Sequence, residues 1–209
     1  MAFLSYSNIG IAGIAACVPK QTIDNYHYTQ YFPEDVVRKV VDKIGIYERR
    51  FADENTCASD LCYAAAERLI ADLQVDKNEI DVLIFISQTP GDDVFNFVAS
   101  KVPKDIKRLC EIIGEDLQLM DYYLLHQAND FMNQFLVNKL KLDAEKVPSS
   151  IAKFGNTSSV SIPLTIVSEL KDKLYGNKKL MLSAFGVGLS WGTVVLQTNN
   201  CHISSLIEI

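Results

Sequence analysis

Several features that would place this chain in a special class are missing. No apolar run reaches the roughly 18 residues that a transmembrane helix needs. No basic block stands out, and the net charge of the 209 residues is -6. The first residues also lack the basic stretch of a secretory signal. These absences predict a protein whose partners include neither a membrane nor a nucleic acid.

Cysteine is scarce as well. The chain has 5 cysteines, an odd number, and no CxxC pair. This pattern supports neither a zinc site nor a disulfide framework, so we expect no metal and no resident cofactor. Free thiols are stable in a reducing compartment, and we therefore expect a cytoplasmic protein. Hydrophobic residues make up 48% of the sequence, which is enough for a packed globular core.

Strand-like and helix-like segments alternate along the chain, and this alternation predicts an α/β fold. Each half offers a strand, a helix and a strand, so we expect two pseudo-repeated halves, 1–92 and 93–209, that join near Asp92. The expected strands are 8–18, 81–87, the start of 121–129, 179–185 and 189–198. The expected helices are 59–74, 93–113, 130–142 and 158–174.

Some of these segments carry a more specific expectation. Residues 81–87 (DVLIFIS) are nearly all apolar, which is typical of a strand covered on both faces. Pro103 should break the helix 93–113 or begin a new one, because proline lacks a backbone N–H. In the helix 130–142, we expect Phe131, Phe135 and Leu140 to face inward.

Three polar loops follow apolar strands: HQAN at 126–129, KFGNTSS at 153–159 and AFGVGLSWG at 184–192. In open α/β sheets, ligands gather beyond the carboxyl ends of strands. A histidine and an asparagine brought together there could stabilise an enolate oxygen, and one such donor is typically worth about 3 kcal/mol. The histidine must then be neutral, with its outward nitrogen protonated and its tautomer fixed by a backbone group.

Each of these residues also has a purely structural explanation. His126 can be a structural histidine at a strand end, and Asn156 after Gly155 is typical of a turn. A tight hairpin alone would explain Gly186 and Gly188. The residue types by themselves therefore leave a catalytic and a structural interpretation open.

The order of the motifs adds a resemblance to a family. LLHQAN, then FGNTSS, then AFGVGLSWGTVVL resembles the C-terminal half of ketoacyl-acyl-carrier-protein synthase III, a thiolase-like condensing enzyme. GIAACVP, KIGIYERRFADENTCASDLCYAAAERLI and DVLIFISQTP resemble its N-terminal half. The resemblance implies a thiolase-like α/β fold and an acyltransferase of fatty acid biosynthesis. It also implies acyl-CoA and malonyl-acyl-carrier protein as substrates, and a homodimer.

The same resemblance assigns roles to residues. It implies that His126 and Asn156 belong to a Cys-His-Asn catalytic triad, and that the backbone N–H of Val187 lies in an oxyanion hole. Phe185 is similar to the aromatic residue near the reacting thioester. The further substrate-binding residues that it implies are Gly186, Gly188, Asn129 and Lys43.

The chain departs from the family at its centre. QTPGD runs directly into DVFNFVASKVPKDIKRL, so the region that carries the family's nucleophilic cysteine is expected to be deleted near Asp92. In addition, Asp130 stands where the family commonly places a basic residue that meets the carrier protein, and Lys43 stands near the position of the family's CoA-contacting arginine. Three hypotheses follow: an impaired condensing enzyme, a residual malonyl decarboxylase, and a non-catalytic acyl- or partner-binding remnant.

Overall fold

A computed structural model gives the fold of residues 9–54, 56, 58–84, 94–186 and 190–209. The helices are α1 (Glu34–Ile44), α2 (Ala58–Leu73), α3 (Val94–Ile113), α4 (Asp130–Leu140), α5 (Ile151–Phe154) and α6 (Ser161–Glu169). The strands are β1 (Gly13–Ile14), β2 (Cys17–Val18), β3 (Gln21–Asp24), β4 (Glu48–Phe51), β5 (Tyr122–Leu125), β6 (Asn177–Gly186), β7 (Ser190–Asn199), β8 (His202–Ile203) and β9 (Ile207–Glu208). Short 3-10 helices are η1 (Asn25–Gln30), η2 (Lys77–Glu79), η3 (Leu117–Leu119), η4 (Ala144–Lys146) and η5 (Ser158–Val160).

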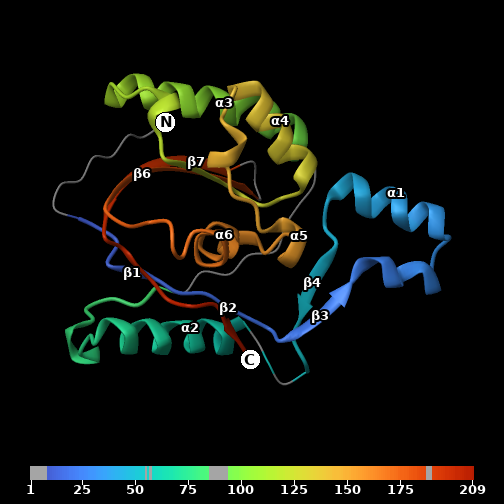
Figure 1. Cartoon of the computed structure of the whole chain (residues 1–209), viewed down its shortest axis with the longest axis horizontal. Coiled ribbons are helices and arrows are strands. Elements are labelled where there is room, and N and C mark those ends of the chain that lie inside the picture. The colour runs from blue at the N-terminus through green and yellow to red at the C-terminus, as the bar shows by residue number, and fades with distance from the viewer. Residues whose placement is uncertain (1–8, 55, 57, 85–93, 187–189) are drawn as a thin grey trace.

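The main body is a stack of alternating helical and sheet layers (Figure 1). Helices α3 and α4 cover one face of the sheet β5-β6-β7, and α5 and α6 lie on its other side. The short strands β1 and β2 follow, with α2 as the outermost layer. This arrangement confirms the predicted α/β class.

The sheet β5-β6-β7 is covered by helices on both faces. β5 pairs in parallel with β6, and β6 pairs antiparallel with β7 over its whole length. Because side chains alternate along a strand, Tyr123 and Leu125 pack toward α3 and α4 while Leu124 packs toward α6. All three are at most 1% exposed. The sheet therefore fixes where the loop after β5 begins.

The layer of α3 and α4 corrects two expectations. Pro103 lies inside α3, which continues past it, so the predicted break is wrong. Val102 and Ile106, on either side of the proline, are 0% and 1% exposed. Their burial on the sheet outweighs a proline penalty of about 3 kcal/mol. Phe131 is 52% exposed rather than inward, because the buried stripe of α4 is Met132, Leu136 and Leu140.

The segment expected as one helix over 158–174 is shorter in the structure. It begins as η5, continues as α6 and ends at Glu169. Leu170 and Leu174 lie beyond that end and are still 1% and 2% exposed. Their spacing therefore reflected burial in the core rather than a continuous helix.

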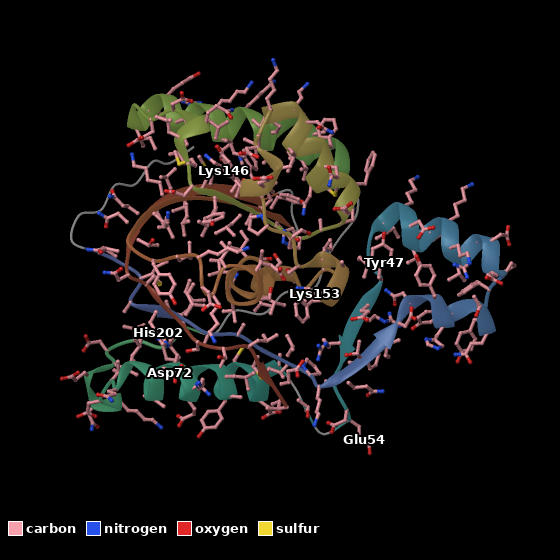
Figure 2. The ribbon with its side chains drawn as sticks, viewed as in Figure 1. Tyr47, Glu54, Asp72, Lys146, Lys153 and His202 are labelled. Carbon is pink, nitrogen blue, oxygen red and sulfur yellow. The ribbon has the colours of Figure 1, made fainter. Side chains whose placement is uncertain are left out.

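The N-terminal segments form smaller elements. The strand expected over 8–18 is reduced to β1 and β2, which pair in parallel with β8 and β9. Helix α2 confirms the expected helix 59–74 and packs Leu69 and Leu73 against Gly13. A cluster of Asp72 and His202 joins α2 to β8, as Figure 2 shows.

The strand expected over 81–87 is wrong in its described part. Residues 81–84 have no strand partner, and residues 85–87 lie outside the described range. Val82, Leu83 and Ile84 are 71%, 86% and 75% exposed. An apolar run forms a buried strand only where neighbouring strands and helices cover it, and here nothing in the described part covers these side chains.

A separate unit lies beside the main body, next to α5 (Figure 1). Strands β3 and β4 pair antiparallel, with η1 and α1 between them. Gly45 ends α1 in the left-handed region, at φ 73°, and its Cα lies close to the Asp130 side chain at the start of α4. No helix in the described part of the chain is long and apolar enough to cross a membrane.

Candidate active site

His126 lies directly after β5, at the carboxyl end of the strand. Its backbone N–H donates to Ser183 O at 2.9 Å, which continues the pairing with β6. The side chain is buried and meets the ring of Phe185 edge-on, with the ring centroids 5.0 Å apart. Burial lowers the pKa of His126, so the ring is neutral at neutral pH. The structure thus brings together two of the residues that the sequence indicated.

The inner nitrogen of His126 meets a side chain that the sequence did not indicate. Nδ1 lies 2.7 Å from the hydroxyl oxygen of Ser161, the first residue of α6. The same oxygen accepts the Gln127 N–H at 3.3 Å. The expected backbone partner of the histidine is therefore replaced by a serine hydroxyl. Nothing in the SSVS stretch marks Ser161 among its neighbours, because its role depends on how α6 approaches β5.

Asn156 lies in a tight turn between α5 and η5. Gly155 precedes it at φ 68° and ψ -157°, a conformation that essentially only glycine adopts. Asn156 Oδ1 accepts the Ser158 N–H at 3.0 Å, with Ser158 in the left-handed region at φ 53°. No hydrogen bond joins His126 to Asn156 in the described part of the chain. The short segment from Asn156 to Ser161 connects them instead.

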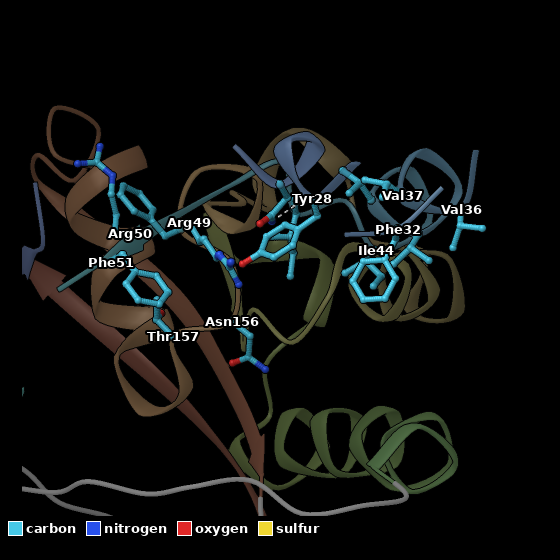
Figure 3. A pocket seen from close by; sticks show the side chains of 16 residues that line it. Tyr28, Phe32, Val36, Val37, Ile44, Arg49, Arg50, Phe51, Asn156 and Thr157 are labelled. Carbon is cyan, nitrogen blue, oxygen red and sulfur yellow. Dashed lines mark hydrogen bonds between the residues drawn. The ribbon is translucent and has the colours of Figure 1, made fainter. Parts of the chain in front are cut away.

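Asn156 also lines a cavity of about 660 Å³, a volume typical of small-molecule sites. The cavity lies between η1, α1, β4 and the loop after α5, and its lining is mostly apolar (Figure 3). Arg49 crosses it with its guanidinium 4.8 Å from the Tyr28 ring and 5.5 Å from the Phe51 ring. His126 is not among the lining residues.

The other residues to which the resemblance assigned a role lie in different parts of the structure. Asn129 caps α4, because its Oδ1 accepts the Met132 N–H at 2.8 Å. Lys43 is exposed in the last turn of α1. Gly186 pairs with Ser190 at the end of the β6–β7 hairpin. Val187 and Gly188 lie outside the described residues.

Asp130 has a structural explanation for its charge. It is the first residue of α4, where the helix dipole stabilises a carboxylate. It also packs against Gly45 at the end of α1. The acidic residue is therefore built into the contact between the β3–β4 unit and the main body.

Three cysteines in the described part of the chain have surroundings that disfavour an activated thiol. Burial is the main cause that raises the pKa of the Cys17, Cys110 and Cys201 thiols, which disfavours the nucleophilic thiolate. Cys62 is exposed on α2, and Cys57 lies outside the described residues. Within the described ranges, no group of three or more His, Cys, Asp or Glu side chains could hold a metal ion.

Residues 111–198, which include His126 and Asn156, match the family of the 3-oxoacyl-acyl-carrier-protein synthase III C-terminal domain. This match covers 88 of the 209 residues, less than half of the chain. Beta-ketoacyl-acyl-carrier-protein synthase III of Streptococcus gordonii is 38% identical over 110 residues, 51% of this chain and 34% of that protein. The enzyme of the same name from Trichodesmium erythraeum is 33% identical over 147 residues, 70% and 44% of the two chains. The matched stretches thus span less than half of these two ketoacyl synthase III proteins.

Solved ketoacyl synthase structures have the same fold. The 3-oxoacyl-acyl-carrier-protein synthase of Burkholderia xenovorans LB400 has a TM-score of 0.82 at 26% identity, covering 96% of this chain and 97% of that one. Synthase III of Thermus thermophilus has a TM-score of 0.75 at 18% identity, covering 92% of this chain and 100% of that one, and shows the fold alone. The thiolase-like fold predicted from the motifs is therefore confirmed.

Proposed function

We propose that this chain carries the decarboxylating half of a ketoacyl synthase III active site. One observation carries the proposal: the inner ring nitrogen of His126 and the side-chain oxygen of Asn156 are both occupied. His126 Nδ1 meets the Ser161 hydroxyl, and Asn156 Oδ1 accepts the Ser158 N–H. Asn156 keeps its Nδ2–H donors, and His126 offers Nε2–H in the tautomer in which Nδ1 accepts from Ser161. Two neutral donors suit an oxygen on which negative charge develops.

The proposed reaction begins with a malonyl thioester. The bond between its carboxylate and its methylene carbon breaks, carbon dioxide leaves, and the electron pair forms an enolate. His126 and Asn156 donate hydrogen bonds to the enolate oxygen. In a complete synthase the carbanion attacks an acyl-cysteine thioester, which forms the new carbon–carbon bond and releases the thiolate. Where no acyl-cysteine is present, water supplies a proton and the product is an acetyl thioester.

The complete function of the family is condensation of acyl-CoA with malonyl-acyl-carrier protein, and we propose that it is impaired here. The raised thiol pKa values of Cys17, Cys110 and Cys201 support this view. So does the direct junction near Asp92, where the resemblance implies that the region of the nucleophile is missing. A cytoplasmic location, a role in fatty acid biosynthesis, a homodimeric assembly and binding of the two thioesters are part of the same proposal.

Release of carbon dioxide from malonyl-CoA tests the proposal. We expect slow release by the chain and a loss of about 100-fold or more in His126→Ala, since one oxyanion donor is worth about 10²–10³ in rate. His27→Ala is the matched control, because His27 lies on η1 with its side chain 80% exposed. Equal rates for His126→Ala and His27→Ala would contradict a role for His126.

Binding of an acyl group without catalysis is a second candidate function. The cavity beside Asn156 supports it, because Phe32, Val36 and Val40 line it and are about half exposed. Titration calorimetry with decanoyl-CoA should then show binding. Val36→Glu should weaken this binding by about 10-fold or more, because the carboxylate would be buried against the acyl group of the ligand. Lys39→Glu, a charge change elsewhere on α1, is the control. Binding that is unaffected by Val36→Glu would contradict this second function.

A further inference from the structure

We propose that Ser161 is a positioning residue that locks His126 in the tautomer with Nε2 protonated. The catalytic consequence of this inference rests on the proposed function, because only a protonated Nε2 can donate to the enolate oxygen. The tautomer itself is a property of the resting protein and can be measured without any substrate.

The contacts of the Ser161 hydroxyl identify its donor and acceptor roles. A serine oxygen has one hydrogen to donate and two positions at which it accepts. The Gln127 N–H, at 3.3 Å, occupies one accepting position. His126 Nδ1, at 2.7 Å, either donates to the second position or accepts the serine hydrogen.

Burial decides between these two possibilities. Ser161 is 1% exposed, so water cannot take its hydrogen. If Nδ1 carried the proton, no acceptor among the described contacts of Ser161 would remain for the hydroxyl hydrogen. A buried donor without an acceptor is penalised, whereas donation to Nδ1 satisfies both groups. The hydroxyl therefore donates, Nδ1 is unprotonated, and the ring proton lies on Nε2.

A buried hydrogen-bond network holds the serine in place. Thr165 Oγ1 donates to Ser161 O at 2.8 Å, so its oxygen is free to accept from the Ser150 hydroxyl at 2.7 Å. The Ser150 N–H donates to Gln127 Oε1 at 3.2 Å, and Gln127 Nε2 donates to Leu125 O at 2.8 Å. The network joins the end of β5 to α5 and α6, and its side chains are at most 2% exposed. Ser161 thus cannot move away without breaking bonds that hold three elements together.

Nitrogen-15 NMR of the imidazole tests the inference. In the wild-type protein at pH 7.5, His126 should show a protonated Nε2 and an unprotonated Nδ1 whose shift is that of a hydrogen-bond acceptor. A protonated Nδ1 in the wild-type spectrum would overturn the proposal, and this result requires no variant to fold.

Variants distinguish the effect of the Ser161 hydroxyl from a general disturbance of the fold. Ser161→Ala should move the Nδ1 shift to that of an acceptor without a partner, while Ser161→Thr keeps the wild-type shift. Ser159→Ala is the control, since Ser159 is an exposed neighbour in η5. A Ser161→Ala spectrum equal to that of the wild type would also overturn the proposal.

Kinetics connect the tautomer to the reaction. Ser161→Ala should slow decarboxylation of malonyl-CoA by about 10- to 100-fold, as losses of orienting partners do. The acidic limb of the pH–rate profile should move to higher pH, because the serine donates only to the neutral ring. An unmoved limb would overturn the positioning role. If the wild type releases no carbon dioxide while the NMR shows Nε2 protonated, the proposed function fails and the tautomer assignment stands.

Discussion

The part of the chain after residue 93 and the part before residue 85 differ in how they are held together. Both buried clusters are built almost entirely from residues 98–203. Among the described residues, the N-terminal part contributes Ala16 and Val18 to the buried members, and Ile14 packs against them. The family match lies in the same C-terminal part, at residues 111–198. The segment that carries His126 and Asn156 therefore also supplies nearly all of its own core.

The N-terminal part depends on the C-terminal end of the chain. Strands β1 and β2 pair with β8 and β9 through two residue pairs each. Polar contacts reinforce this attachment: Arg50 pairs with Glu208 at 2.6 Å, and Asp72 bonds to His202 and Ser204. A small apolar contribution and a few polar contacts thus hold these segments, and changes in the two parts should have very different consequences.

The largest contrast is expected from the same substitution in each part. Leu124→Ala removes a side chain that is 0% exposed between α6 and the sheet, and should lower the free energy of unfolding by about 2–5 kcal/mol. Leu83→Ala removes one that is 86% exposed, and should change it by less than about 0.5 kcal/mol. Urea denaturation followed by circular dichroism measures both. Similar losses in the two variants would mean that residues 81–84 are covered in solution.

The second largest effect on the free energy of unfolding is expected at a glycine in the contact between the two parts. Gly45→Ala places a Cβ 2.5 Å from Asp130 Cβ and forces alanine to φ 73°. The crowding and the left-handed backbone together should lower the free energy of unfolding by about 2–4 kcal/mol.

Gly114→Ala separates the two causes. Gly114 has φ 67°, and nothing lies within 4 Å of its ideal Cβ, so only the backbone penalty of about 1–2 kcal/mol applies. The same denaturation measurement applies to both variants. Equal losses at the two glycines would show that α1 and Asp130 do not touch.

The smallest effect is expected at the polar attachment of α2. The Ser204 hydroxyl and the Arg68 guanidinium lower the pKa of the Asp72 carboxyl to about 2. Because the folded pKa lies below the unfolded value of about 3.9, Asp72 contributes stability above pH 4 that is lost as the pH falls toward 2.

Melting temperatures measured between pH 5 and pH 2.5 check this contribution. Asp72→Asn should be less stable at pH 5 and should lose less on acidification than the wild type does. The exposed residue Asp35 provides the control variant Asp35→Asn, which should follow the wild-type curve. An unchanged acid dependence in Asp72→Asn would show that α2 is attached by apolar contacts alone.

The elements that the sequence predicted well are those whose pattern is local. β5, α4 and the β6–β7 hairpin combine apolar periodicity with caps and turns that lie in the same segment. The failures at Pro103 and at 81–84 have the opposite cause. Packing on the sheet keeps α3 continuous through the proline, and no strand in the described part of the chain pairs with residues 81–84. Whether another element covers a segment cannot be inferred from the residues of that segment alone.

The residues of the candidate site also divide into those that a local motif predicts and those that depend on how distant elements pack. The motifs indicated His126 and Asn156, because short loop sequences distinguish the family. The serine at Nδ1 was not predictable, because Ser161 contacts His126 only when α6 packs on the end of β5. Asn129 illustrates the reverse case: the resemblance implied substrate binding, and the structure shows a helix cap whose remaining role is still a prediction.

Product analysis by mass spectrometry after incubation with both butyryl-CoA and malonyl-CoA tests the central claim most directly. A site that decarboxylates but cannot be acylated should yield acetyl-CoA, no 3-oxohexanoyl-CoA and no butyryl adduct on the protein. Formation of 3-oxohexanoyl-CoA would contradict the account, because it requires a cysteine that accepts the butyryl group. Absence of acetyl-CoA above the His126→Ala background would contradict it as well.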